Sequence, residues 1–201
     1  MKKVLIAKPN YRKFSPTGYQ MLLDKGYDVV ATDLDRDYFL EELLPMVGDI
    51  DACIANCEPW GEEAMSAAPK VKILARYGTG MNSVDTEAAK RHGIMVTNCP
   101  GVKANSVAEH IMLLLLAGLR DLPRMNEMTK EGQWKNLNFH EVSGSTVGIL
   151  GFGYIGKLVA KKLTGFDCRT IAYDVVHDDE TAAKYGVECV SFEELMSQSD
   201  I

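Results

Sequence analysis

Three glycines, Gly151, Gly153 and Gly156, stand at the spacing G-x-G-x-x-G. They follow an apolar run at 146–150 and open a segment, 154–164, in which apolar residues recur every three or four positions. In such a strand, turn and helix, the first glycine permits the tight turn and the second lets backbone approach a pyrophosphate. The third lets the helix pack closely on the strand. Free N–H groups at the helix start would face the negative charge. The pattern therefore predicts a dinucleotide-binding turn.

An acidic residue at the end of the following strand supports this prediction. Asp174 ends the run 170–173 and lies 18 residues after Gly156. A carboxylate at this place binds ribose hydroxyls and repels a 2′-phosphate, which favours NAD over NADP. Arg169 precedes the strand and lies too early to bind such a phosphate. An ordinary glycine turn with a solvated aspartate remains the alternative. The predicted cofactor-binding residues here are Gly151, Gly153, Tyr154, Ile155, Gly156 and Asp174.

Apolar runs alternate with helical patterns along the chain, which predicts an α/β fold with parallel sheets covered on both faces. A long helical pattern at 104–119 is followed by a polar join at 121–145, which contains Pro123. The alternation then begins again. The expected strands are 4–7, 27–31, 52–55, 71–75, 94–97, 146–150, 170–173 and 187–190, and the other expected helices end near Gly26 or cover 37–47, 61–68, 85–92, 154–164, 179–185 and 192–197.

Composition favours small-molecule chemistry. The chain has 201 residues, 46% of them hydrophobic, and a net charge of −6, which argues against a nucleic-acid or membrane-surface partner. Its five cysteines are odd in number and scattered, as expected for thiols in the cytoplasm. Cys53 and Cys57 could offer two metal ligands, but no matching pair follows, so no metal site is predicted. The longest apolar stretch, 111–119, is too short for a transmembrane helix.

Five stretches in a fixed order give the whole chain a resemblance to the D-isomer-specific 2-hydroxyacid dehydrogenase family, especially its phosphoglycerate-dehydrogenase-like members. Together these stretches are much more specific than the glycine turn alone. They cover 62–72, 75–85 (Ala-Arg-Tyr-Gly-Thr-Gly-Met-Asn-Ser-Val-Asp), 93–101, 106–110 and 147–156.

This resemblance implies two domains and a reaction. Residues 1–101 would form a flavodoxin-like substrate domain, and 102–201 the first part of a Rossmann-like NAD-binding domain, with its hinge helix and dimer arm. The implied enzyme is a cytoplasmic NAD-dependent homodimer that oxidises a 2-hydroxy acid to a 2-keto acid. By similarity, backbone N–H groups near Tyr77 and Gly78 would hold the substrate carboxylate, and Thr79 would face the nicotinamide. A plain turn at a strand end is the alternative for this loop.

The family's catalytic arginine, acid and histidine are expected beyond Ile201, so no catalytic residue is assigned within the chain. The 201 residues are accordingly expected to be an N-terminal fragment, inactive alone. A half-sheet with an unpaired apolar edge, and Trp134 and Phe139 in a polar stretch, add to the expectation of self-association. The alternative function is a non-catalytic NAD-binding or oligomerisation module.

Overall fold

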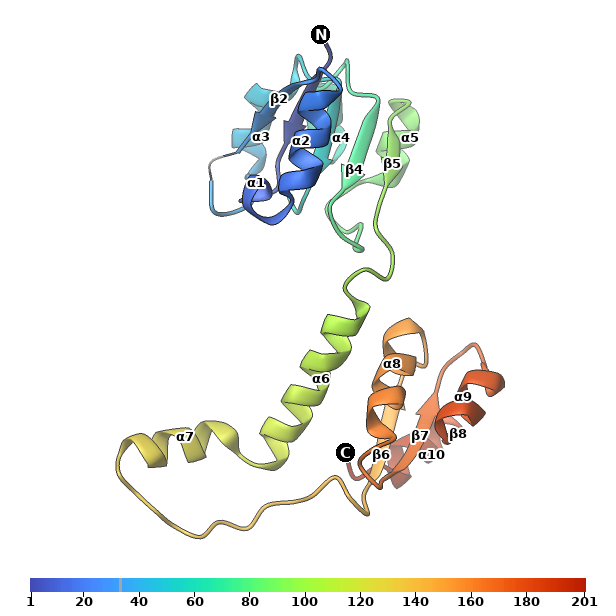
Figure 1. Cartoon of the computed structure of the whole chain (residues 1–201). Helices are drawn as coiled ribbons and strands as arrows, with labels where there is room; N and C mark the ends of the chain where they lie inside the picture. The colour runs from blue at the N-terminus through green and yellow to red at the C-terminus, as the bar shows by residue number, and fades with distance from the viewer. Residues whose placement is uncertain (33) are drawn as a thin grey trace. The chain divides into compact units, whose positions relative to one another are not determined.

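The computed structural model describes residues 1–32 and 34–201. The chain divides into two compact units, Met1–Val102 and Lys103–Ile201, which Figure 1 shows in blue to green and in green to red. The sequence places the division one residue earlier, between residues 101 and 102. The roles of the two parts, substrate binding and cofactor binding, stay predictions.

The first unit contains a five-stranded parallel sheet. Its strand order, β2-β1-β3-β4-β5, is the flavodoxin-like order, in which connections run outward in both directions from β1. Val4 of β1 pairs with both Val29 and Ala52, which makes β1 an interior strand. The flavodoxin-like prediction is therefore confirmed. The strands are β1 (Lys3–Ile6), β2 (Asp28–Ala31), β3 (Ala52–Ala55), β4 (Ile73–Arg76) and β5 (Met95–Thr97).

Helices connect these strands, and the largest core cluster forms where three of them meet the sheet. Leu43 of one helix, Trp60 of a loop and Leu74 of β4 are all fully buried in this cluster. Such side chains exclude water and hold the strand ends, where the loops begin, in a fixed arrangement. The helices are α1 (Tyr11–Phe14), α2 (Pro16–Asp24), α3 (Leu40–Val47), α4 (Glu62–Ser66) and α5 (Thr86–Arg91).

The second unit contains a smaller parallel sheet of order β6-β7-β8. The long helix α6 packs beside α8, and Ala108 and Met112 of α6 share a core cluster with Val159 of α8. This parallel sheet is Rossmann-like, as predicted. The elements are α6 (Ala104–Leu119), α7 (Leu122–Lys130), β6 (Thr146–Leu150), α8 (Tyr154–Leu163), β7 (Arg169–Tyr173), α9 (Asp179–Tyr185), β8 (Val187–Cys189) and α10 (Phe192–Gln198).

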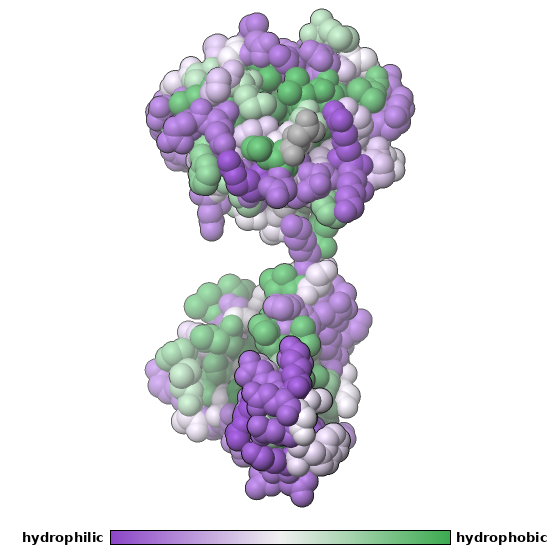
Figure 2. Space-filling view, turned by 90° about the vertical axis from the view of Figure 1, so that its left-hand side faces the viewer, coloured by the Kyte–Doolittle hydropathy of each residue, from purple (hydrophilic) through white to green (hydrophobic). Residues whose placement is uncertain are grey.

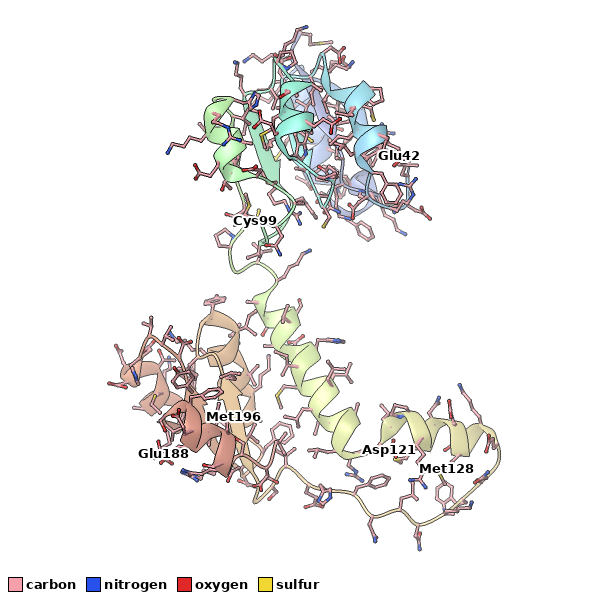
Figure 3. All side chains as sticks on the ribbon, turned by 180° about the vertical axis from the view of Figure 1, so that it is seen from behind. Glu42, Cys99, Asp121, Met128, Glu188 and Met196 are labelled. Atoms are coloured by element: carbon pink, nitrogen blue, oxygen red, sulfur yellow. The ribbon has the colours of Figure 1, made fainter. Side chains whose placement is uncertain are left out.

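The structure differs from the sequence-based expectation in three elements. The supposed polar join contains helix α7, with Asp121 at its start and Met128 along it (Figure 3). Pro123 lies in its first turn, where a proline costs no hydrogen bond. Helix α3 begins at Leu40 rather than at 37, and the short helix α1 was not expected.

The free edge of β6 is partly covered by the last residues of the chain. The Gly148 N–H donates to the carbonyl of Ile201 at 2.9 Å, and the Asp200 N–H donates to that of Thr146 at 2.9 Å. The Asp200 carboxylate also accepts from the Thr146 N–H at 2.8 Å. The edge expected to be unpaired is therefore already paired at Thr146 and Gly148.

None of the helices in the described part of the chain is long and apolar enough to cross a membrane.

Candidate cofactor and substrate sites

The glycine turn of the second unit is fixed by the neighbouring strand β7. The Gly151 N–H donates to the Tyr173 carbonyl at 2.8 Å, and the next N–H, that of Phe152, donates to the Asp174 carboxylate at 2.6 Å. The turn and the carboxylate, which are separate features of the sequence, are thus bonded to each other directly.

Two of the glycines are required by geometry. Gly151 has a φ of +96°, a conformation that L side chains rarely adopt. At Gly156, an added Cβ would lie only 2.2 Å from the Gly151 carbonyl oxygen, so helix α8 could not approach the turn so closely with any other residue. These positions support the roles of tight turn and close packing expected from the motif.

The start of helix α8 offers free donors. Gly153 caps the helix without a side-chain hydrogen bond, and the first turn has no acidic residue. Within residues 1–32 and 34–201, the N–H groups of Gly153, Tyr154 and Ile155 have no partner. Unpaired amides at the positive end of a ten-residue helix form a binding place for phosphate oxygens.

Asp174 is held in its charged form. The N–H of Val176 donates to one of its oxygens at 3.1 Å and that of Phe152 to the other. These bonds, the Val176 bond foremost, lower the pKa of Asp174 below its ordinary range. Each oxygen retains a lone pair for a ribose hydroxyl. The turn, the free amides and this carboxylate together fit an NAD molecule.

In the first unit, the loop Arg76–Gly80 lies at the end of β4. Tyr77 is tied to the neighbouring helices, because its hydroxyl bonds to Ser15 Oγ at 3.0 Å and its ring packs edge-on against Tyr11 at 5.5 Å between centroids. Thr79 Oγ1 donates to the Cys99 carbonyl at 3.0 Å. The loop is therefore anchored on both sides and presents a defined surface.

The expected donors in this loop need a correction. The Tyr77 N–H donates to Ala55 of β3 at 2.7 Å, and the Gly78 N–H donates to the Arg76 carbonyl at 2.9 Å, so neither is free for a substrate carboxylate. For the residues that the structure describes, the N–H groups of Thr79 and Gly80 make no hydrogen bond, and both residues are exposed. The free pair of donors lies two residues later than expected.

Arg76 lies beneath this loop. One guanidinium nitrogen donates to the Tyr77 carbonyl at 3.0 Å and another reaches the Cys57 sulfur at 3.3 Å. Its Nε is buried and lacks a partner among the described atoms. A Cβ at Gly78 would stand 3.1 Å from the guanidinium, which explains a small residue there.

Glu58 is a buried acid that the sequence patterns missed. Its side chain is fully buried, and it accepts hydrogen bonds from the Asn56 N–H at 2.9 Å and from the Trp60 indole N–H at 3.1 Å. Burial nevertheless raises its pKa. The sequence of the segment Asn56-Cys57-Glu58-Pro59-Trp60 does not indicate that Glu58 is buried, because buried positions do not recur at a regular spacing in a loop.

Replacing Glu58 by Gln should flatten the pH dependence of stability. Because its folded-state pKa is raised, the ionised form costs more in the folded protein than in the unfolded chain. Wild-type stability should therefore fall as the pH rises above about 4.3, the ordinary value for glutamate, and Glu58→Gln should remove this fall. The measurement is urea unfolding from pH 4 to 8, followed by Trp60 fluorescence in a Trp134→Phe background.

Glu63→Gln is the matched control, because Glu63 is exposed in the same region. It should keep the wild-type slope. If Glu58→Gln follows the wild-type curve at every pH, burial of the Glu58 charge does not affect folding.

Two histidines have acidic neighbours in the structure, and one of these pairs, His92 with Glu62, joins residues far apart in the sequence. His92 Nε2 lies 2.7 Å from a Glu62 oxygen, and Arg91 bonds the other oxygen at 2.6 Å. These partners, Arg91 first, hold the pKa of Glu62 at about 2. His177 lies near Asp179. The Glu62 group is an exposed ion-pair cluster rather than a proton-transfer site.

Comparison with known proteins agrees with this geometry. The family model described as "D-isomer specific 2-hydroxyacid dehydrogenase, NAD binding domain" matches residues 112–201, the part that contains the glycine turn and Asp174. The chain belongs to the D-isomer-specific 2-hydroxyacid dehydrogenase family. NAD, predicted as the cofactor, is confirmed by this match.

Individual relatives extend the likeness to the first unit. D-3-phosphoglycerate dehydrogenase of Mycobacterium tuberculosis is 38% identical over 83% of this chain and 31% of its own length. Glyoxylate reductase of Thermococcus kodakarensis is 34% identical over 94% of this chain and 60% of its own. An NAD-dependent formate dehydrogenase from Staphylococcus aureus, solved with NAD, is 30% identical with a TM-score of 0.82, and the match covers all of this chain and 63% of the other.

The match thus covers only 31% of the length of the phosphoglycerate dehydrogenase and 60% of the length of the glyoxylate reductase.

Proposed function

We propose that the chain is part of an NAD-dependent oxidoreductase that interconverts D-2-hydroxy acids and 2-keto acids. The observation that carries the proposal is the direct bond between the glycine turn and the Asp174 carboxylate. It joins the two halves of an NAD-binding site in the part of the chain that matches the family.

The cofactor roles follow from the described contacts. The N–H groups of Gly153, Tyr154 and Ile155 bind the pyrophosphate, while Gly151 and Gly156 allow the turn to form. The Asp174 carboxylate binds the adenosine ribose. When bound, NAD supplies the acceptor or donor of a hydride. Thr79 is proposed to face its nicotinamide end.

The substrate role belongs to the loop after β4. We assign the substrate carboxylate to the free N–H groups of Thr79 and Gly80, because backbone donors at a glycine turn suit an anion. Tyr77 and Gly78 remain part of the site and determine its shape, Tyr77 through its bond to Ser15. The names of the relatives make glyoxylate and 3-phosphoglycerate the first substrates to test.

Proton transfer, and the binding of the substrate by a catalytic side chain, are assigned to groups outside residues 1–201. The 201-residue chain should then bind NAD without turnover. As a separate proposal, the protein acts in the cytoplasm. The test is NADH consumption against a panel of 2-keto acids, measured for the 201-residue chain and for any longer natural form found by intact-mass measurement. NADH binding with no turnover in any natural form would favour the alternative, a non-catalytic NAD-binding module.

A homodimer is proposed through α7 and the segment that follows it. Trp134 is 93% exposed, and with Met125, Met128 and Phe139 it lines an open hollow. Figure 2 shows hydrophobic atoms exposed on the second unit. Exposed aromatic and methionine side chains around a hollow are typical of interfaces. Size-exclusion chromatography with light scattering should give twice the chain mass, and a clean monomer would contradict the proposal.

A further inference from the structure

Three side chains of types that bind metals lie close together at the β8 edge of the sheet in the second unit. His177 lies in the segment between β7 and α9, Asp179 begins α9, and Cys189 ends β8. Their ligand atoms, one nitrogen, one oxygen and one sulfur, all lie within 4.8 Å of one another. Figure 1 shows α9 and β8 side by side at this edge. The fold thus brings Cys189 beside His177 and Asp179, which precede it in the sequence and lie close to each other.

These three side chains have no competing partners. In the described part of the chain, no hydrogen bond or ion pair is made by the His177 ring, the Asp179 carboxylate or the Cys189 thiol. The neighbouring Asp178 is engaged, since it accepts from the Thr181 N–H at 3.0 Å and pairs with Lys157. Lys157 is therefore neutralised by Asp178 and leaves the carboxylate of Asp179 available.

We propose that His177, Asp179 and Cys189 bind a Zn²⁺ ion. Imidazole nitrogen and thiolate sulfur favour zinc over Mg²⁺ or Ca²⁺. Tetrahedral zinc with bonds of about 2.0 to 2.3 Å needs ligand atoms roughly 3.3 to 3.8 Å apart. The present separations reach this with small rotations of the exposed His177 and Asp179 side chains. Three protein ligands leave the fourth position to water.

Binding has two physical consequences. A cysteine thiol carries its proton at neutral pH, whereas zinc binds the thiolate. Zinc replaces that proton, and one proton is released into solution for each ion bound. The ion also ties the segment after Asp174 to β8, so it should stabilise this edge of the unit.

The test uses the 201-residue chain and Zn²⁺ alone, without NAD, so that its outcome is independent of the proposed function. Calorimetry should show one ion per chain, and His177→Ala and Cys189→Ala should each weaken binding at least about tenfold. Substitution by Co²⁺ should give a thiolate-to-cobalt absorption band that disappears in Cys189→Ala. Circular dichroism checks that the variants fold.

Cys168→Ala is the matched control, since Cys168 is a half-buried thiol of the same unit outside the cluster. It should leave the affinity and the cobalt band unchanged. Absence of binding, binding that survives in both His177→Ala and Cys189→Ala, or loss of the band in Cys168→Ala would each overturn the proposal.

Discussion

Replacing Gly153 by Val is expected to weaken NADH binding at least about tenfold while leaving the fold intact. In the structure, a Cβ at Gly153 would meet no atom within 4 Å, and its φ of −77° is open to any residue. The free protein can therefore accept the side chain. Its methyl groups would occupy the space in front of the free amides of α8, where the pyrophosphate must lie.

Gly165→Val provides the control for this measurement. A Cβ added at Gly165 would likewise meet no atom within 4 Å, and this residue lies beyond the end of α8. Calorimetry with NADH should find wild-type affinity for this variant. Equal affinity of Gly153→Val and the wild type would refute the assignment of the turn. Gly156→Ala could not decide the question, because its contact of 2.2 Å with Gly151 would damage the fold itself.

Replacing Asp174 by Asn is expected to shift the preference from NAD(H) toward NADP(H) by about tenfold or more. The carboxylate is ionised at neutral pH, as the lowered pKa of Asp174 reinforces, so it repels a 2′-phosphate. Asparagine removes the charge and keeps one acceptor oxygen, so it can accept from only one of the two amides, that of Val176 or that of Phe152. The affinities for NADH and NADPH are compared by fluorescence titration, and their ratio is the quantity tested.

Two controls separate charge from other effects. Asp167→Asn removes an exposed carboxylate elsewhere in the unit, at a φ of +52° that asparagine tolerates, and should leave the ratio unchanged. Added salt should reduce the discrimination of the wild type but have less effect on Asp174→Asn. A ratio that does not change in Asp174→Asn would mean that another group selects the cofactor.

The glycine turn could be predicted from the sequence because each of its requirements is local. Gly151 needs a backbone conformation, Gly156 needs close packing with its own turn, and Asp174 must follow at a fixed distance. The strands of both sheets were predicted for the same reason, since apolar runs between turn residues are local signals. Helix α7 was missed because its surface is polar and Pro123 resembles a helix breaker.

The features that could not be predicted depend on distant backbone partners. The Tyr77 N–H donates to the Ala55 carbonyl of another strand, so the free donors are those of Thr79 and Gly80. The cluster of His177, Asp179 and Cys189 exists only because β8 returns beside the segment after β7. The spacing of residues along the chain does not predict these contacts.

The bond between Asp174 and Phe152 bears on how fast a cofactor can bind. Since the carboxylate already holds the glycine turn in place, the entropy of ordering that loop is lost when the protein folds and not when a dinucleotide arrives. Encounter with the second unit then requires no prior rearrangement of this turn. The association rate should rise in proportion to cofactor concentration, without the plateau that a slow loop closure would impose.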